Sequence, residues 1–315
     1  MTRAFIFPGQ GSQAVGMGKA LAEAFAPARE VFEEVDDALN QKLSHLIWEG
    51  PPEELLRTLN AQPAIMALSL AIIRTMQKEA GLDLAKHARL VAGHSLGEYS
   101  ALCAAGAFSL ADTARLLKAR GEAMETATPV GMGGMSALLG AEIEQAEALA
   151  KQCAEAAGGI CVVANDNAPG QVVISGIKAA IDKAPEIAKA LGIKRAMPVN
   201  VAAPFHSPLM QPAADAMAAK LAAVTIRPLA VPVVANVTAA ETAEPETIRR
   251  LLVEQVTGRV RWRESVLAFR GYGVTTTVEA GGNKVLTGMV KRIDKDLATV
   301  TLDTPADIEA FVRTL

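Results

Sequence analysis

The stretch that decides the fold is Gly93-His94-Ser95-Leu96-Gly97, which carries the pattern G-x-S-x-G. It follows the apolar run Ala88–Ala92, which predicts a short buried strand. It precedes Glu98–Ala105, whose small residues predict a closely packed helix. A strand, this pattern and a helix together predict a nucleophile elbow, a sharp turn that exposes the serine at the end of the strand. Gly93 and Gly97 leave room at the turn, where bulkier side chains would clash.

Ser95 is therefore the predicted nucleophile. At the first turn of the following helix, free N–H groups and the helix dipole can hold a negatively charged oxygen. The alternative interpretation is an ordinary strand–turn–helix joint in which the serine only caps the helix.

Composition indicates a soluble globular protein and excludes several other classes. Of the 315 residues, 50% are apolar and 21% are charged, and the net charge of −3 does not fit a nucleic-acid-binding protein. The longest apolar stretch, Ala64–Ile73, is too short to span a bilayer. Residues 3–9 lack the apolar core and cleavage site of a signal peptide, so we expect a cytoplasmic protein that does not enter the membrane.

Cysteine usage agrees with a reducing compartment. The chain has three cysteines, Cys103, Cys153 and Cys161. An odd number without close spacing argues against a disulfide framework and against a zinc site. We expect all three to be small buried residues.

The N-terminal part predicts one strand followed by helices. Ala4–Phe7 is the expected first strand, and the glycine-rich loop Pro8–Gln13 after it is either a plain turn or a source of a backbone amide that faces the Ser95 oxyanion. Residues 17–80 show helical spacing, with Pro63 expected to open the apolar helix 64–73. The next helix, Leu110–Met124, carries Arg120, which by pattern alone is a solvated cation.

The middle of the chain predicts an inserted small lobe, residues 129–198. Its expected order is strand, helix, two strands, helix, strand, as in ferredoxin-like domains. The segments are strands 135–139, 160–164, 171–175 and 194–199, helices 142–157 and 178–191, and a turn at 165–170. Residues 1–128 and 199–315 then form the large lobe, with further strands at 231–237, 275–279 and 299–303.

The alternating cations Arg259, Arg261 and Arg263 have two interpretations. They form either one solvated face or a basic patch for a phosphate-bearing or acidic partner.

A serine nucleophile needs a base, and histidine is the natural one. Of the four histidines, His45 fits a helix face, His87 the far end of the elbow strand, and His94 diverges from its neighbour Ser95. His206 lies on a short loop between two prolines, after the apolar stretch 199–203, and is the predicted base. The acid of a hydrolase triad would have to precede it, largely within the inserted lobe, which favours a Ser–His dyad oriented by an amide or a backbone carbonyl.

Together these stretches resemble the malonyl-CoA:acyl carrier protein transacylases of fatty acid synthesis and the related acyltransferase domains of polyketide synthases. The matching residues run nearly from end to end: Phe7–Gln13, Gln62–Ala64, Gly93–Ala101, Arg120-Gly121, Asn167–Gly176, Ala203–Met210 and Lys284–Gly288. One departure is Gly281-Gly282-Asn283, where the family has Gly-Pro-Gly, and it affects the expected shape of that loop.

The resemblance implies catalytic roles for five residues. Ser95 would be acylated by the thioester, with His206 acting first as general base and then as acid. The backbone amides of Gln10 and Leu96 would form the oxyanion hole. Gln255 would orient His206 through its carbonyl.

The resemblance also implies a substrate pocket. Arg120 would pair bidentately with the free carboxylate of the malonyl group, a geometry that suits arginine better than lysine. Gln62 and Phe205 would line the pocket, and Phe205 directly before the histidine resembles malonyl-selective members.

The implied fold is an α/β-hydrolase-like large lobe with an inserted ferredoxin-like small lobe. The implied reaction is ping-pong transfer from malonyl-CoA to an acidic acyl carrier protein that docks transiently, with no metal or other cofactor, by a monomer. Two alternatives remain: a serine thioesterase or esterase on the same elbow, and a non-catalytic carrier-binding module. A hydrolase needs no carboxylate clamp such as Arg120, and a binding module has no use for the Ser95–His206 pair.

Overall fold

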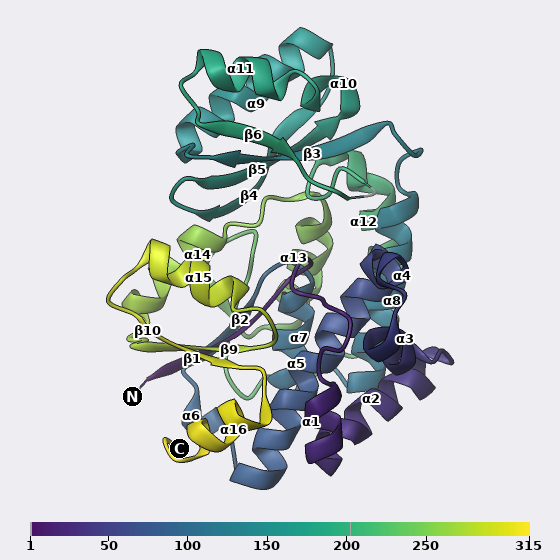
Figure 1. The fold of residues 1–315 in the computed structure, drawn as a ribbon, viewed down its shortest axis with the longest axis vertical. Coiled ribbons are helices and arrows are strands. Elements are labelled where there is room, and N and C mark those ends of the chain that lie inside the picture. Colours follow the sequence, from purple (N-terminus) through teal and green to yellow (C-terminus); the bar gives the residue numbers. More distant parts are fainter. Residues whose placement is uncertain (1, 202) are drawn as a thin grey trace.

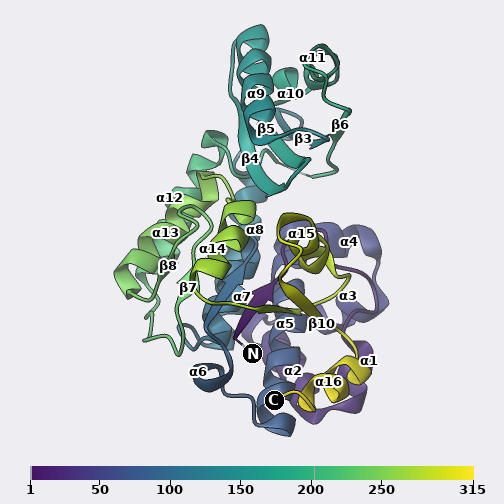
Figure 2. The ribbon, with the colours of Figure 1, turned by 90° about the vertical axis from the view of Figure 1, so that its left-hand side faces the viewer.

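The structure is a computed structural model that describes residues 2–201 and 203–315. The chain forms a large lobe with a six-stranded sheet and a small lobe with a four-stranded sheet, stacked one above the other in both views (Figures 1 and 2). The predicted fold class, α/β with a parallel sheet and a separate small lobe, is confirmed.

The large sheet has the strand order β10-β9-β1-β2-β7-β8. All neighbouring strands are parallel except β8, which is antiparallel to β7. The strands are β1 (Arg3–Phe7), β2 (Leu90–Gly93), β7 (Val233–Val234), β8 (Glu241–Thr242), β9 (Thr276–Ala280) and β10 (Ala298–Leu302).

Helices cover both faces of this sheet. They are α1 (Lys19–Ala24), α2 (Ala26–Leu39), α3 (Leu43–Glu49), α4 (Pro52–Leu56), α5 (Thr58–Ala80), α6 (Leu84–His87), α7 (Leu96–Ala104), α8 (Leu110–Thr126), α12 (Gln211–Ala222), α13 (Pro245–Thr257), α14 (Trp262–Gly271), α15 (Val285–Ile293) and α16 (Pro305–Val312), with a short 3₁₀ turn at Pro208–Met210. Because side chains alternate along a strand, Phe5 and Phe7 of β1 join one core, while Ala4 and Ile6 join the other.

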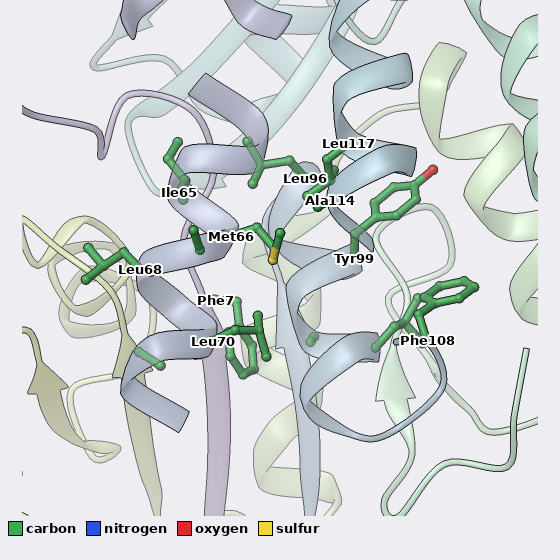
Figure 3. Packing of buried hydrophobic residues seen from close by; sticks show 14 of the residues in the cluster. Phe7, Ile65, Met66, Leu68, Leu70, Leu96, Tyr99, Phe108, Ala114 and Leu117 are labelled. Carbon is green, nitrogen blue, oxygen red and sulfur yellow. The ribbon is translucent and has the colours of Figure 1, made fainter. Parts of the chain in front are cut away.

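The larger of these two cores holds the nucleophile elbow in place. Figure 3 shows Phe7 of β1 among side chains of α5, α7 and α8, including Met66, Leu96 and Leu117. These residues are all at most 1% exposed, so the helix that follows Ser95 is fixed on both sides by close packing.

The small lobe has an antiparallel sheet with the order β4-β5-β3-β6. Its elements are β3 (Gly133–Leu139), α9 (Ile143–Ala157), β4 (Cys161–Ala168), β5 (Gln171–Ile177), α10 (Lys178–Ile181), α11 (Ala184–Ala190) and β6 (Arg195–Pro198). The helices and the sheet enclose a separate apolar core.

Two expectations about the small lobe are wrong. The predicted turn at 165–170 is shorter, because β4 continues to Ala168 and pairs with β5, which leaves Pro169-Gly170 as the turn. The predicted helix 178–191 is two helices, because Pro185 near the start of α11 cannot continue the hydrogen-bond ladder of α10.

Three expectations about the large lobe also need correction. Pro63 lies inside α5, which already begins at Thr58, so the missing N–H falls early in a long buried helix. The strand expected at 231–237 is reduced to β7, because the chain turns at Ala235. The side chain of the next residue, Asn236, points toward the elbow. Val199–Val201 and Ala203 belong to no strand or helix, and Ala202 lies outside the described residues.

A backbone bridge joins the two lobes at Val260. Its N–H donates to Ala164 O at 2.8 Å, and its carbonyl accepts from Asp166 N–H at 3.0 Å. Next to this bridge, Arg263 Nε binds both oxygens of Asp166, at 3.0 and 2.9 Å.

The other two cations of this basic stretch are also paired. Arg259 binds Glu147 and Arg261 binds Glu264. All three arginines are therefore partly exposed and ion-paired, and the two interpretations of this stretch, a solvated face and a basic patch, stay predictions.

Two further observations concern the expectations from composition. Among the helices of the described residues, none is long and apolar enough to cross a membrane. Cys153 and Cys161 are buried, but Cys103 is only half-buried.

Candidate active site

Ser95 lies between β2 and α7 in a backbone conformation that side chains rarely adopt. Its φ of 53° and ψ of −112° mark the sharp turn that the G-x-S-x-G pattern predicts. A Cβ atom at Gly93 would lie 1.9 Å from the carbonyl oxygen of Gly97, and a Cβ atom at Gly97 would lie 2.2 Å from that of Phe7. Glycine is therefore required at both flanks, because the backbone segments touch there.

His206 is hydrogen-bonded to the serine. Its Nε2 lies 2.9 Å from Ser95 Oγ, and its Nδ1 lies 2.9 Å from Gln255 O and 3.1 Å from Gly258 O. A carbonyl oxygen can only accept, so Nδ1 carries the proton and Nε2 is free to accept the proton of the serine hydroxyl. Burial, followed by the Arg120 cation, lowers the pKa of His206 to about 3, so the ring is neutral at physiological pH.

Arg120 is buried, unlike the solvated cation that its helix pattern predicts. It is 1% exposed, and its guanidinium points at the serine. Nη1 donates to Gln62 Oε1 at 2.8 Å, and Nη2 donates to Ser95 Oγ at 3.1 Å and to Gln255 Oε1 at 2.9 Å. Within the described ranges, no carboxylate forms a salt bridge with it, so the fork can still receive an anion. Burial lowers the pKa of Arg120, but an arginine stays protonated in proteins.

Three buried polar residues brace the elbow, and two of them had no role assigned from the sequence. Asn236 Oδ1 accepts from Ser95 N–H at 2.7 Å, and its Nδ2 donates to Gly93 O at 2.6 Å. Glu98 Oε2 accepts from Asn236 N–H at 3.0 Å and from Gln255 Nε2 at 2.8 Å. One signal was present: Asn236 lies near the end of the predicted strand 231–237, at the sheet edge where Ser95 lies.

The site lines a cavity of ≈ 370 Å³ to which both lobes contribute. Its lining includes Gln10, Gln62, Ser95, Leu96, Arg120, Phe205 and His206 from the large lobe, and Met135, Asn165, Asn167, Gln171 and Val173 from the small lobe. The structure thus brings the predicted pocket residues Gln62 and Phe205 to the same cavity as Ser95 and His206.

The two predicted oxyanion-hole residues also face this cavity. Leu96 begins α7 and Gln10 lies in the loop after β1. In the part of the chain that the structure describes, neither backbone N–H donates a hydrogen bond. Both are therefore free to donate to an oxygen that develops negative charge.

The remaining histidines lie apart from the serine hydroxyl. His45 is exposed on α3, and His87 Nδ1 accepts from Asp83 N–H at 3.0 Å beside α6. His94 lines the cavity but bonds Asn167 of β4 at 2.8 Å, so it connects the elbow to the small lobe. No group of three His, Cys, Asp or Glu side chains within residues 2–201 and 203–315 is arranged to hold a metal ion.

The loop Gly281-Gly282-Asn283, which departs from the Gly-Pro-Gly of the family, packs against the N-terminal loop Pro8–Gln13. Asn283 has a φ of 69°, and its Nδ2 donates to Ser12 O at 2.9 Å. Gly281 is confined by Pro8, because a Cβ atom there would lie 2.5 Å from Pro8 Cγ.

Comparisons with known proteins give matches along nearly the whole chain. The family model described as acyl transferase domain matches residues 4–302. A malonyl CoA-acyl carrier protein transacylase of Bacillus subtilis (strain 168) is 45% identical over 312 residues, which cover 99% of this chain and 96% of that protein. An acyl-carrier-protein-S-malonyltransferase from Bartonella henselae is 54% identical with a TM-score of 0.97, and the match covers 100% of this chain and 99% of that one.

A further structural match contains a bound partner. It is a malonyl-transacylase in complex with a holo type II polyketide synthase acyl-carrier protein. That chain is 40% identical with a TM-score of 0.95, and the match covers 100% of both chains.

Proposed function

The chain belongs to the acyl transferase domain family, and from this we propose that it transfers the malonyl group of malonyl-CoA to the phosphopantetheine thiol of an acyl carrier protein. This activity supplies malonyl units to fatty acid synthesis. The observation that carries the proposal is the position of Ser95 Oγ, which lies 2.9 Å from the His206 base and 3.1 Å from the buried Arg120 fork. A nucleophile beside a guanidinium that has no carboxylate partner among the described residues suits an acyl group that ends in a carboxylate.

In the first half-reaction, Ser95 Oγ attacks the thioester carbonyl while His206 Nε2 takes its proton. The N–H groups of Gln10 and Leu96 stabilise the oxyanion of the tetrahedral intermediate. The bond to the CoA sulfur then breaks, and His206 returns the proton to the leaving thiolate. This leaves a malonyl ester on Ser95 and free CoA.

In the second half-reaction, the carrier thiol attacks the serine ester. His206 takes the thiol proton and returns it to Ser95 Oγ as the ester bond breaks, which restores the free enzyme. Throughout both steps Arg120 holds the malonyl carboxylate, which would otherwise lose several kcal/mol of hydration on entering the cavity. All groups in this mechanism belong to the protein and its two substrates.

Intact-protein mass spectrometry tests the nucleophile. Malonyl-CoA alone should add one malonyl group to the protein, and Ser95→Ala should take up none. Holo acyl carrier protein should then remove the label and become malonylated itself. A label that persists in Ser95→Ala would contradict the assignment.

The same experiment separates transfer from hydrolysis. Without a thiol acceptor the malonyl-enzyme should release malonate slowly, because a transferase must keep its acyl-enzyme intact until a carrier arrives. Rapid turnover of malonyl-CoA in the absence of carrier would favour a thioesterase on the same elbow.

A further inference from the structure

Glu98 is a buried carboxyl group that takes no part in the proposed reaction. It lies in the first turn of α7, three residues after Ser95, and is 2% exposed. Burial raises the pKa of Glu98 to about 7, although Asn236 and Gln255 both donate hydrogen bonds to it. A carboxyl group is costly in such a place, where an apolar side chain would pack without that cost. Its contacts indicate what it contributes.

The side chain of Gln255 connects Glu98 to Arg120. Its Nε2 donates to Glu98 Oε2 at 2.8 Å and to Ser95 O at 3.0 Å, while its Oε1 accepts from Arg120 Nη2 at 2.9 Å. An amide has donors at one end and an acceptor at the other. Rotating it by half a turn would place its donors against the guanidinium and its oxygen against two other oxygens. Glu98 and the Ser95 carbonyl together therefore select the one orientation in which Gln255 can hold Arg120.

This indirect contact leaves the guanidinium available. A carboxylate bound directly to Arg120 would occupy the paired donors that a substrate carboxylate needs. With Gln255 between them, Glu98 fixes the guanidinium through a neutral amide, so that no carboxylate of the protein takes the place of the substrate carboxylate. Glu98 also accepts from the backbone of Asn236, whose side chain holds Ser95 N–H at 2.7 Å.

We propose that Glu98 is a positioning residue, which through Gln255 fixes the Arg120 fork for an acyl group bearing a carboxylate and through Asn236 fixes the backbone of Ser95. The inference rests on the proposed function and assigns selectivity to a residue that does not contact substrate. The positioning requires one oxygen that accepts the hydrogen bonds of both Asn236 and Gln255. Glu98→Gln keeps such an oxygen, so this variant should retain most of the selectivity. Glu98→Met keeps the volume and removes the acceptor.

Steady-state kinetics with malonyl-CoA and acetyl-CoA test the proposal in the full-length protein. Glu98→Met should lower the ratio of kcat/KM for malonyl-CoA over acetyl-CoA by about tenfold or more, the usual effect of losing a hydrogen bond to a charged group. Glu98→Gln should stay within about threefold of the wild-type ratio. Asp36→Asn is the matched control, because Asp36 is also buried and accepts from the N–H and Oγ of Ser44, far from the cavity. It should lower stability and leave the ratio unchanged.

A second pair of variants keeps the test decisive if Glu98→Met does not fold. Gln255→Met removes the side-chain link but keeps the backbone carbonyl that holds His206, so it should show the same loss of selectivity. When both substitutions fold, their combination should lose no more selectivity than either alone, because both break one chain of contacts. Additive losses, or an equal fall with both thioesters, would overturn the proposal. Failure of the proposed function is a separate result, in which the wild-type protein takes up no malonyl group.

Discussion

Ser95 and His206, the proposed reacting pair, both have a positive φ, which is uncommon outside glycine. Ser95 has a φ of 53° and His206 a φ of 54°. Such conformations cost about 1–3 kcal/mol each and persist only where surrounding contacts impose them. Here Asn236 holds Ser95 N–H, and two backbone carbonyls hold His206 Nδ1. These contacts therefore hold Ser95 and His206 within hydrogen-bond distance of each other before any substrate binds.

The pKa of His206 predicts an unusual pH profile. Because burial and the Arg120 cation lower this pKa to about 3, the base stays unprotonated far below the usual range of histidine. The value of kcat/KM for malonyl-CoA should therefore not fall with a pKa of about 6.5, the ordinary histidine value. A bound malonyl carboxylate neutralises Arg120 and raises the pKa of His206, so the acid limb of kcat should lie at higher pH than that of kcat/KM.

Glu98 is the internal control for this profile, because burial raises its pKa to about 7. If kcat/KM of the wild-type protein falls near neutral pH and this fall is absent in Glu98→Gln, the titrating group is Glu98. A fall with a pKa near 6.5 that remains in Glu98→Gln would contradict the depressed pKa of His206.

Arg120 should decide between malonyl and acetyl groups. Removing a buried, hydrogen-bonded charge partner typically costs about 2–5 kcal/mol, so Arg120→Ala should lose on the order of 10²-fold or more in kcat/KM with malonyl-CoA. With acetyl-CoA it should lose little or gain, because the cation no longer has to be buried beside a methyl group. Arg115→Ala is the matched control, since Arg115 is an exposed cation on the same helix. An equal fall for both thioesters would show that Arg120 is only structural.

At the scale of elements, the site depends on three segments that meet at the elbow. β2 and α7 present Ser95, the C-terminal end of α13 presents the carbonyls of Gln255 and Gly258 to His206, and α8 presents Arg120. Each of these elements is held by core packing, which fixes the positions of Ser95, Arg120 and the two carbonyls. His206 itself lies on the loop before the 3₁₀ turn at Pro208–Met210, and the two carbonyls hold its ring.

The elbow should tolerate no side chain at its first glycine. A Cβ atom at Gly93 would lie 1.9 Å from Gly97 O and 2.4 Å from Glu98 N, so Gly93→Ala must force β2 and α7 apart. We expect a loss of more than about 3 kcal/mol in the free energy of unfolding, or failure to fold.

The matched control is Gly288→Ala in α15, where a Cβ atom meets nothing within 4 Å. It should stabilise the protein by about 0.5–1 kcal/mol, because alanine favours a helix interior. Urea unfolding measures the change in the free energy of unfolding, which should be negative for Gly93→Ala and positive for Gly288→Ala. Similar stabilities of the two variants would contradict the backbone contact at the elbow.

At the scale of the whole molecule, the cavity exists only while the two lobes stay together. The Asp166 side chain is 1% exposed and the Arg263 side chain is 25% exposed, and they pair beside the Val260 bridge. Arg263→Met should cost about 1–3 kcal/mol of stability, less than a fully buried pair because water still reaches the arginine. It should also lower kcat/KM with malonyl-CoA, since β4 lines the cavity.

The loss of stability in Arg263→Met should come from the Asp166 carboxylate, which stays buried without its partner. Adding Asp166→Asn to Arg263→Met should therefore recover part of the stability, as measured by thermal unfolding. Arg250→Met, which breaks a solvent-exposed pair with Glu254, should cost less than about 1 kcal/mol. If Arg263→Met and Arg250→Met lose the same amount, the lobe contact is not what holds β4 in place.

The sequence by itself determined the parts of this protein that depend on neighbouring residues. The apolar run, the two glycines and the small residues after Ser95 predict the strand, the sharp turn and the helix, because each rule acts over a few positions. The order of strands and helices likewise predicts an α/β large lobe with a separate antiparallel small lobe, and the motifs predict the family. These inferences agree with the fold and with the family match.

Local patterns did not decide which side chains meet at the serine. The resemblance implied Arg120, Gln62 and Gln255, and the tertiary structure decided how they meet. The pattern of α8 makes Arg120 an exposed cation, yet the fold buries it against Ser95, Gln62 and Gln255, which lie 25, 58 and 135 residues away along the chain. The contacts of Asn236 and the continuation of β4 through Asn165 also depend on distant partners. The physical reason is that a buried polar group must find its hydrogen-bond partner wherever the packed chain brings one, and no local rule contains that position.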